Sequence, residues 1–152
     1  MMSPAGFEHG RVVVRITRPL AEFVEQHGLG VVTGVETGFQ ISHDPDTVRA
    51  PDAAFLRAAR VPSEPQTGFF PGPPDLAVEV LSPDDRAGQV LAKVRDWLAA
   101  GTQAVWVIDP WTHTVSVYAG PNQAEVLGEE AVLTGGELLP GFELPVSGVF
   151  AR

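Results

Sequence analysis

The chain has 152 residues, of which 44% are hydrophobic and 19% charged, and it carries a formal net charge of −9 at pH 7. This composition is typical of a globular protein rather than a disordered one, so we expect one domain over residues 1–152. The chain contains no cysteine, which excludes disulfides and thiolate metal sites, and it shows no signal-like or long apolar segment, so we expect a cytoplasmic protein without a membrane partner.

The negative charge weighs against a nucleic-acid partner, because such proteins are expected to present an electropositive face. The ten basic residues form no tract, and all but Lys93 are arginines. A lysine suits proton chemistry that arginine performs poorly, because its pKa responds to its surroundings. A single retained lysine is also compatible with chance, and carboxylates grouped to hold cations would themselves add to the acidity.

The first half of the chain predicts one long helix followed by short strands. Apolar residues recur at helical spacing from Glu8 to Gln26, and Pro19 predicts a kink or break inside this helix. Glycine and proline then bound strands at 29–33, 35–41 and 48–56, a turn at 43–46 and a loop at 60–74. We expect the first two of these strands to pair as a hairpin near Gly34.

The second half shows a clearer pattern. Residues 75–81 alternate in polarity, which predicts a strand with one apolar face and one face carrying two acids. The segment 82–85 resembles the cap of a helix that runs to Ala100 and ends at Gly101. Beyond it we expect a hairpin of strands at 104–108 and 114–118, and a tail at 138–144 of loop and short strand covering an end of the sheet. Together these elements predict a mixed α/β fold.

Lys93 lies on the shoulder of this second helix. The apolar arc of the helix is formed by Ala87, Val90, Leu91, Val94, Trp97 and Leu98, and Lys93 falls about 100° from its centre. A lysine there can lay its stem along the edge of the core and extend its ammonium into a neighbouring cleft. The alternative is a solvated lysine paired with Asp96 or Gln89.

Three carboxylates are candidates for holding a cation. Asp75 and Glu79 face the same way, but about 13 Å separates their positions along a strand, which is too far for both to bind one Mg²⁺. Asp52 would lie beside Glu79, about 4.8 Å away, if its strand pairs antiparallel with residues 75–81. Asp75 then acts through a water or a second ion, or only starts the strand.

Other reactive groups form no recognisable site. The four histidines are widely spaced and match no zinc pattern: His9, His27, His43 and His113. Asp84 and Asp85 fit the role of capping residues better than that of ligands. The absence of a glycine-rich phosphate loop and of a Ser-His-Asp pattern disfavours nucleotide hydrolysis and acyl transfer.

Several blocks of the sequence resemble a family of nucleases. Pro51-Asp52, a long gap, Glu79-Val80-Leu81 and a lysine from the next helix are similar to a variant of the PD-(D/E)XK nuclease motif. More closely, nearly the whole chain resembles the Uma-two family of restriction endonucleases. The blocks that carry the resemblance are Arg49-Ala50-Pro51-Asp52, residues 74–83, the helix with Lys93 and Gly101, residues 104–110, and Leu139-Pro140-Gly141-Phe142.

The resemblance implies a restriction-endonuclease-like core, a mixed β-sheet flanked by helices. It implies Asp52, Glu79 and Lys93 as the catalytic set, because in this family a helix lysine replaces the lysine expected at the position of Leu81. It also implies a DNA endonuclease that uses Mg²⁺ or Mn²⁺, with His9 as an accessory residue, and often a homodimer.

Members of the family usually carry a further segment with an acidic residue before the stretch that resembles Met2-Ser3-Pro4 and His9, where this sequence begins. The resemblance therefore predicts either an incomplete metal site or a truncated start. A different class of function remains open on the same fold. The alternative is a catalytically inactive homodimeric module that binds a protein or a nucleic acid.

Overall fold

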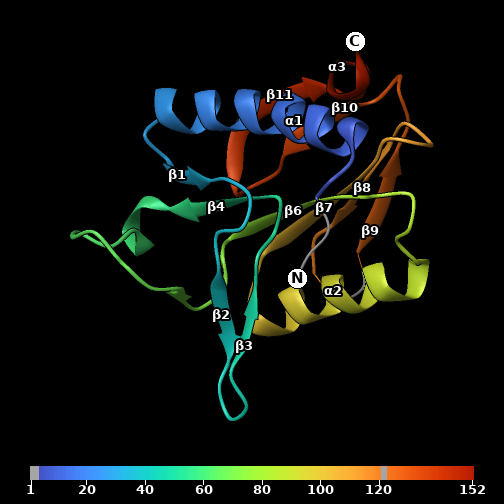
Figure 1. The fold of residues 1–152 in the computed structure, drawn as a ribbon. Helices are drawn as coiled ribbons and strands as arrows, with labels where there is room; N and C mark the ends of the chain where they lie inside the picture. The colour runs from blue at the N-terminus through green and yellow to red at the C-terminus, as the bar shows by residue number, and fades with distance from the viewer. Residues whose placement is uncertain (1–3, 121–122) are drawn as a thin grey trace.

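The computed structural model, which describes residues 4–120 and 123–152, is a mixed α/β fold with helices on both faces of a central sheet (Figure 1). Residues Met2 and Ser3 of the family-like stretch lie outside this description. The six strands of the sheet follow the order β1-β4-β6-β7-β8-β9. They are β1 (Gly30–Thr33), β4 (Ala53–Arg57), β6 (Leu76–Val80), β7 (Ala104–Asp109), β8 (Thr114–Tyr118) and β9 (Ala124–Leu127).

One connection in the sheet is a parallel crossover. Strands β6 and β7 are parallel and are joined by α2 (Ala87–Ala100), whereas the other neighbouring strands of the sheet pair antiparallel. The strand predicted at 75–81 is β6, and the predicted hairpin of 104–108 and 114–118 is the β7–β8 pair. Both predictions are confirmed. The apolar side chains of these strands alternate between the two faces of the sheet, and helices pack on both faces.

Helix α1 (Phe7–Gln26) covers one face of the sheet. Its residues Val12, Ile16, Leu20 and Val24 recur every four positions and are fully buried. Pro19 lies inside the helix without ending it, so of the predicted kink or break the break is wrong. The packed apolar stripe runs through the turns on both sides of the proline, and this burial stabilises the helix beyond it.

Helix α2 covers the opposite face and begins later than the capping pattern suggests. Its first residue is Ala87, and Ser82 to Asp85 form a separate turn in which the Asp85 carboxylate accepts the Ser82 N–H at 2.7 Å. The predicted cap is therefore wrong: the aspartate satisfies the turn instead of the helix. The predicted end is confirmed, because Gly101 adopts a left-handed conformation with φ of 113°.

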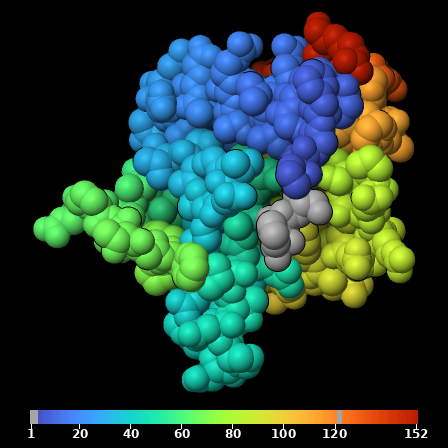
Figure 2. All heavy atoms as spheres, viewed as in Figure 1, coloured from blue at the N-terminus to red at the C-terminus, as the bar shows by residue number. Residues whose placement is uncertain are grey.

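The predicted hairpin around Gly34 is also wrong. Strand β2 (Phe39–Ser42) leaves the central sheet and pairs with β3 (Thr47–Arg49) and β5 (Phe70–Pro71) in a small sheet of its own. Its β2–β3 hairpin projects from the body in Figures 1 and 2. Phe39 explains the change, since its buried ring packs on Trp97 of α2 with centroids 6.4 Å apart.

The C-terminal region adds more structure than the predicted loop and short strand. Strands β10 (Val132–Gly135) and β11 (Leu139–Pro145) form a two-stranded sheet, and the short helix α3 (Val146–Phe150) follows. Their buried residues join the core beneath α1. A 3₁₀ turn, η1 (Ala58–Arg60), follows β4. No helix in the described part of the chain is long and apolar enough to cross a membrane.

Candidate active site

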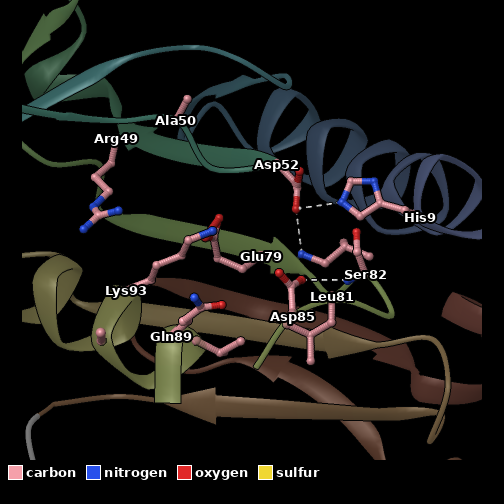
Figure 3. A pocket seen from close by; sticks show the side chains of 13 residues that line it. His9, Arg49, Ala50, Asp52, Glu79, Leu81, Ser82, Asp85, Gln89 and Lys93 are labelled. Atoms are coloured by element: carbon pink, nitrogen blue, oxygen red, sulfur yellow. Dashed lines mark hydrogen bonds and ion pairs between the residues drawn. The ribbon is translucent and has the colours of Figure 1, made fainter. Parts of the chain in front are cut away.

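A pocket of about 590 Å³ opens where the ends of β4 and β6 face α2 (Figure 3). The polar side chains that line it come from four separate segments of the chain. They are His9, Arg49, Asp52, Glu79, Ser82, Asp85, Gln89 and Lys93. The fold thus brings four of the sequence-predicted residues, Asp52, Glu79, Lys93 and His9, to one cavity.

Strand pairing places Asp52 beside Glu79. Strands β4 and β6 are antiparallel with Ala53 opposite Val78, and the Asp52 N–H donates to the Val78 carbonyl at 3.0 Å. One step along this register sets Asp52 opposite Glu79. The antiparallel arrangement expected from the sequence is therefore confirmed.

The carboxylate of Asp52 is held in place from two sides. Its Oδ2 accepts the Val80 N–H at 2.7 Å and lies 3.3 Å from His9 Nε2 on α1. Because a carboxylate only accepts hydrogen bonds, Nε2 of His9 is the donor in this contact. The other ring nitrogen of His9, Nδ1, is buried and has no hydrogen-bond partner among the described residues.

Glu79 lines the same pocket, and its pKa is raised. Burial raises its pKa to about 7, the nearby Lys93 ammonium lowers that pKa, and the Asp52 carboxylate raises it. Near neutral pH the Glu79 side chain is therefore divided between its acid and carboxylate forms. A divalent cation in the pocket would favour the carboxylate.

Lys93 is exposed on α2, and its ammonium points toward Glu79 (Figure 3). The alternative pairing of this lysine with Asp96 does not occur, since the Asp96 carboxylate binds the Arg49 guanidinium instead. None of the ion pairs formed within the described ranges involves Lys93.

Asp75 does not reach this pocket. It is 3% exposed at the opposite end of β6, where its Oδ1 lies 3.0 Å from Arg60 and 3.3 Å from Arg57. Its Oδ2 accepts the Arg57 N–H at 2.8 Å. Both oxygens are engaged with arginine, so the structure gives Asp75 a stabilising role and does not support the expected part in metal binding.

The pocket offers few side-chain ligands for a divalent cation. Within residues 4–120 and 123–152, no group of three or more His, Asp or Glu side chains could hold a metal. Two carboxylates, Asp52 and Glu79, do face the same pocket, and none of the side-chain hydrogen bonds among the described residues involves the Glu79 carboxylate. Mg²⁺ commonly binds through one or two carboxylates and takes its other ligands from water and substrate phosphate. The residues present therefore fit Mg²⁺ or Mn²⁺.

Several pocket residues were not singled out from the sequence. Arg49 directly precedes the Ala50-Pro51-Asp52 block, and that position was the one available signal. Ser82, Asp85 and Gln89 carry no such signal, because their place depends on the turn before α2. The remaining histidines lie elsewhere: His27 stacks on Phe23, and His113 pairs with Glu129.

The comparisons with known proteins concern the family and the fold. The model of the Uma2 (Uma-two) family, described as "Putative restriction endonuclease", matches residues 1–147. Among solved structures, the chain is similar to that of a "putative nuclease belonging to DUF820" from Anabaena variabilis, with a TM-score of 0.83 and 25% sequence identity. That likeness covers 98% of this chain and 83% of the other. No protein of curated function matches the chain.

Proposed function

The chain belongs to the Uma2 family, and we propose that it is a metal-dependent endonuclease that hydrolyses phosphodiester bonds in DNA. Asp52, Glu79 and Lys93 are its catalytic residues. The observation that supports this most strongly is that two strands and one helix bring these three side chains into one pocket. The family and the nuclease-like fold support the reaction class.

The two carboxylates are the metal-binding part of the proposal. Asp52 and Glu79 would hold Mg²⁺ or Mn²⁺, which when bound polarises a phosphodiester and acidifies a water. Asp52 is oriented for this by the Val80 N–H and by His9, which both contact its Oδ2, so its Oδ1 would be available to the ion. Oriented ligands lose little freedom on binding, so the preformed geometry supports affinity.

Lys93 contributes the positive charge of the mechanism. A water oxygen attacks phosphorus and the bond to the leaving oxygen breaks, so negative charge grows on the phosphoryl oxygens. The Lys93 ammonium, directed toward Glu79, stabilises that charge and positions the water. Glu79 would be a carboxylate in this state, because a bound cation opposes the burial that raises its pKa to about 7. The proton that the water loses passes to solvent, and the leaving oxygen takes up a proton from solvent.

The reaction is tested with supercoiled plasmid incubated with Mg²⁺, with Mn²⁺ or with a chelator. We expect nicking by the wild type only with a divalent cation, and loss of nicking by Lys93→Ala with an unchanged thermal unfolding curve. Arg95→Ala is the matched control, since Arg95 is an exposed cation of α2 that does not line the pocket. Metal-dependent nicking retained by Lys93→Ala would remove the lysine from the mechanism.

A second candidate is a binding module that keeps the fold without cleavage. The observation that favours it is that no three His, Asp or Glu side chains of the described residues are grouped to hold a metal, although Asp85 also lines the pocket. A plasmid that stays intact under all metal conditions, together with retained binding of a protein or DNA partner, would support this candidate. In either case we propose a homodimer, which light scattering tests through the molar mass in solution.

A further inference from the structure

Three polar side chains form a stripe along α2. Gln89, Lys93 and Asp96 are spaced by four and three residues, so they lie on one face of the helix. Gln89 and Lys93 line the pocket, and Asp96 lies one turn beyond Lys93. The orientation of this face toward the sheet therefore decides where the lysine ammonium lies.

Asp96 connects the stripe to the strand that leads into the catalytic aspartate. Its carboxylate forms an ion pair with Arg49, the last residue of β3, only three residues before Asp52. The two side chains are 35% and 43% exposed, so water only partly screens the pair. Arg49 also faces the pocket, and its charge lowers the pKa of Glu79.

A second contact lies directly beside this ion pair. Phe39 is the cross-strand partner of Arg49, and its ring packs on Trp97, the neighbour of Asp96 on α2. Consecutive residues of a helix point about 100° apart around the axis. The buried side chains of Val94 and Trp97 already fix one face of α2 on the sheet, and the ion pair adds a polar restraint beside that face.

We propose that the Arg49–Asp96 ion pair, acting with the Phe39–Trp97 contact, sets the rotation of α2 and so holds Lys93 toward Glu79. Arg49 and Asp96 are then positioning residues of the site. The assignment rests on the proposed nuclease function for its effect on rate, but the position of Lys93 can be measured without any reaction. A displacement of about 1 Å at a reacting group can cost up to a hundredfold in rate.

The test uses the fact that Lys93 is the only lysine. In protein labelled with ¹³Cε-lysine, the single side-chain lysine resonance reports the surroundings of this one ammonium. We compare the wild type with Asp96→Ala, Arg49→Gln and the conservative Asp96→Glu. Asp84→Ala is the matched control, because it also removes an exposed acid near α2 but does not line the pocket.

We expect Asp96→Ala and Arg49→Gln to shift the Lys93 resonance and to lower kcat by about tenfold or more, with KM changed by less than about threefold. Asp96→Glu should restore most of both values, and Asp84→Ala should match the wild type. A Lys93 resonance in Asp96→Ala identical to that in Asp84→Ala would overturn the proposal, as would a raised KM with unchanged kcat. If the wild type cleaves nothing, the nuclease function fails, and the resonance alone still decides the role of the ion pair.

Discussion

The fold raises the pKa of Glu79 and so disfavours its charged form. Glu79 lies between Asp52, whose carboxylate raises its pKa, and Lys93, whose ammonium lowers it, while burial has the largest effect. The result is a pKa of about 7 for Glu79 in the pocket without a cation. A cation held between Asp52 and Glu79 would lower the pKa of Glu79 and favour its carboxylate form.

The raised pKa of Glu79 predicts a pH-dependent stability. Between its ordinary pKa of 4.5 and about 7, the folded state holds a proton that the unfolded state has lost, so stability falls as pH rises through this window. Glu79→Gln removes the titration. We expect this variant to match the wild type near pH 4 and to exceed its free energy of unfolding by about 2 kcal/mol at pH 8. Urea unfolding at both pH values measures this, and an equal difference at both would refute the burial argument.

The contact of His9 with Asp52 predicts an effect on metal binding. His9→Ala leaves the Asp52 carboxylate with one fewer hydrogen bond, and loss of such support typically costs about ten- to a hundredfold in affinity. We expect Mn²⁺ to bind His9→Ala about tenfold more weakly in calorimetry. His9→Gln, whose amide can donate in place of Nε2, should recover part of the affinity. Equal affinities for all three proteins would assign His9 to packing alone.

Several residues of the site could be predicted from the sequence, because local strand and helix patterns show which side chains share a face. Strand spacing favoured Asp52 beside Glu79, whereas the helix pattern left Lys93 either in the cleft or in solvent. The resemblance to the nuclease family is what selected the three residues together. The arginine partners of Asp75 were not predicted: the expected register already sets Arg57 next to it, but Arg60 comes from a 3₁₀ turn that the sequence pattern does not show. The residue pattern shows which side chains share a face, but not which distant charges have already neutralised them.

At the scale of elements, β4, β6 and α2 position the site. The pairing of β4 with β6 sets Asp52 against Glu79, and the crossover through α2 brings Lys93 over the end of β6. These elements were predicted well, since alternation and helical spacing are strong where an element is buried on one side. The β2–β3 hairpin was missed because tertiary packing of Phe39 on Trp97 overrode the local strand pattern.

The register of the sheet depends on a close backbone approach at Gly30. A Cβ at this position would lie 2.0 Å from the Leu56 carbonyl oxygen. The φ of Gly30 is 153°, a conformation that favours glycine. We expect Gly30→Ala to lower the free energy of unfolding by about 3 kcal/mol. Gly10→Ala on exposed α1, where nothing lies within 4 Å, should instead raise it by about 0.5–1 kcal/mol. Chemical denaturation compares the two, and equal effects would contradict the packing described for β1.

At the scale of the whole molecule, the charge of −9 opposes a polyanionic substrate. The pocket contains Arg49 and Lys93 as its permanent cations, against the carboxylates of Asp52, Glu79 and Asp85. Composition alone predicted this conflict, yet it could not show that the acids gather where a cation would offset them. That grouping depends on the three-dimensional arrangement of four segments.

This balance predicts that a divalent cation controls DNA binding. With Ca²⁺, used as a cation that supports binding with little cleavage, we expect the affinity for a fluorescent duplex to rise at least about tenfold over that in a chelator. The cation would offset the Asp52 and Glu79 charges that otherwise repel phosphate. Fluorescence anisotropy measures the change, and Glu79→Gln should lose most of the Ca²⁺ effect. An affinity independent of Ca²⁺ in the wild type would contradict this account.

The most direct measurement is anomalous X-ray scattering from crystals soaked in Mn²⁺. The account predicts a manganese peak in contact with both the Asp52 and the Glu79 carboxylates, with the Lys93 ammonium beside it, and no such peak in crystals of Glu79→Gln. A wild-type crystal with the pocket open to solvent but without manganese between these two carboxylates would contradict it.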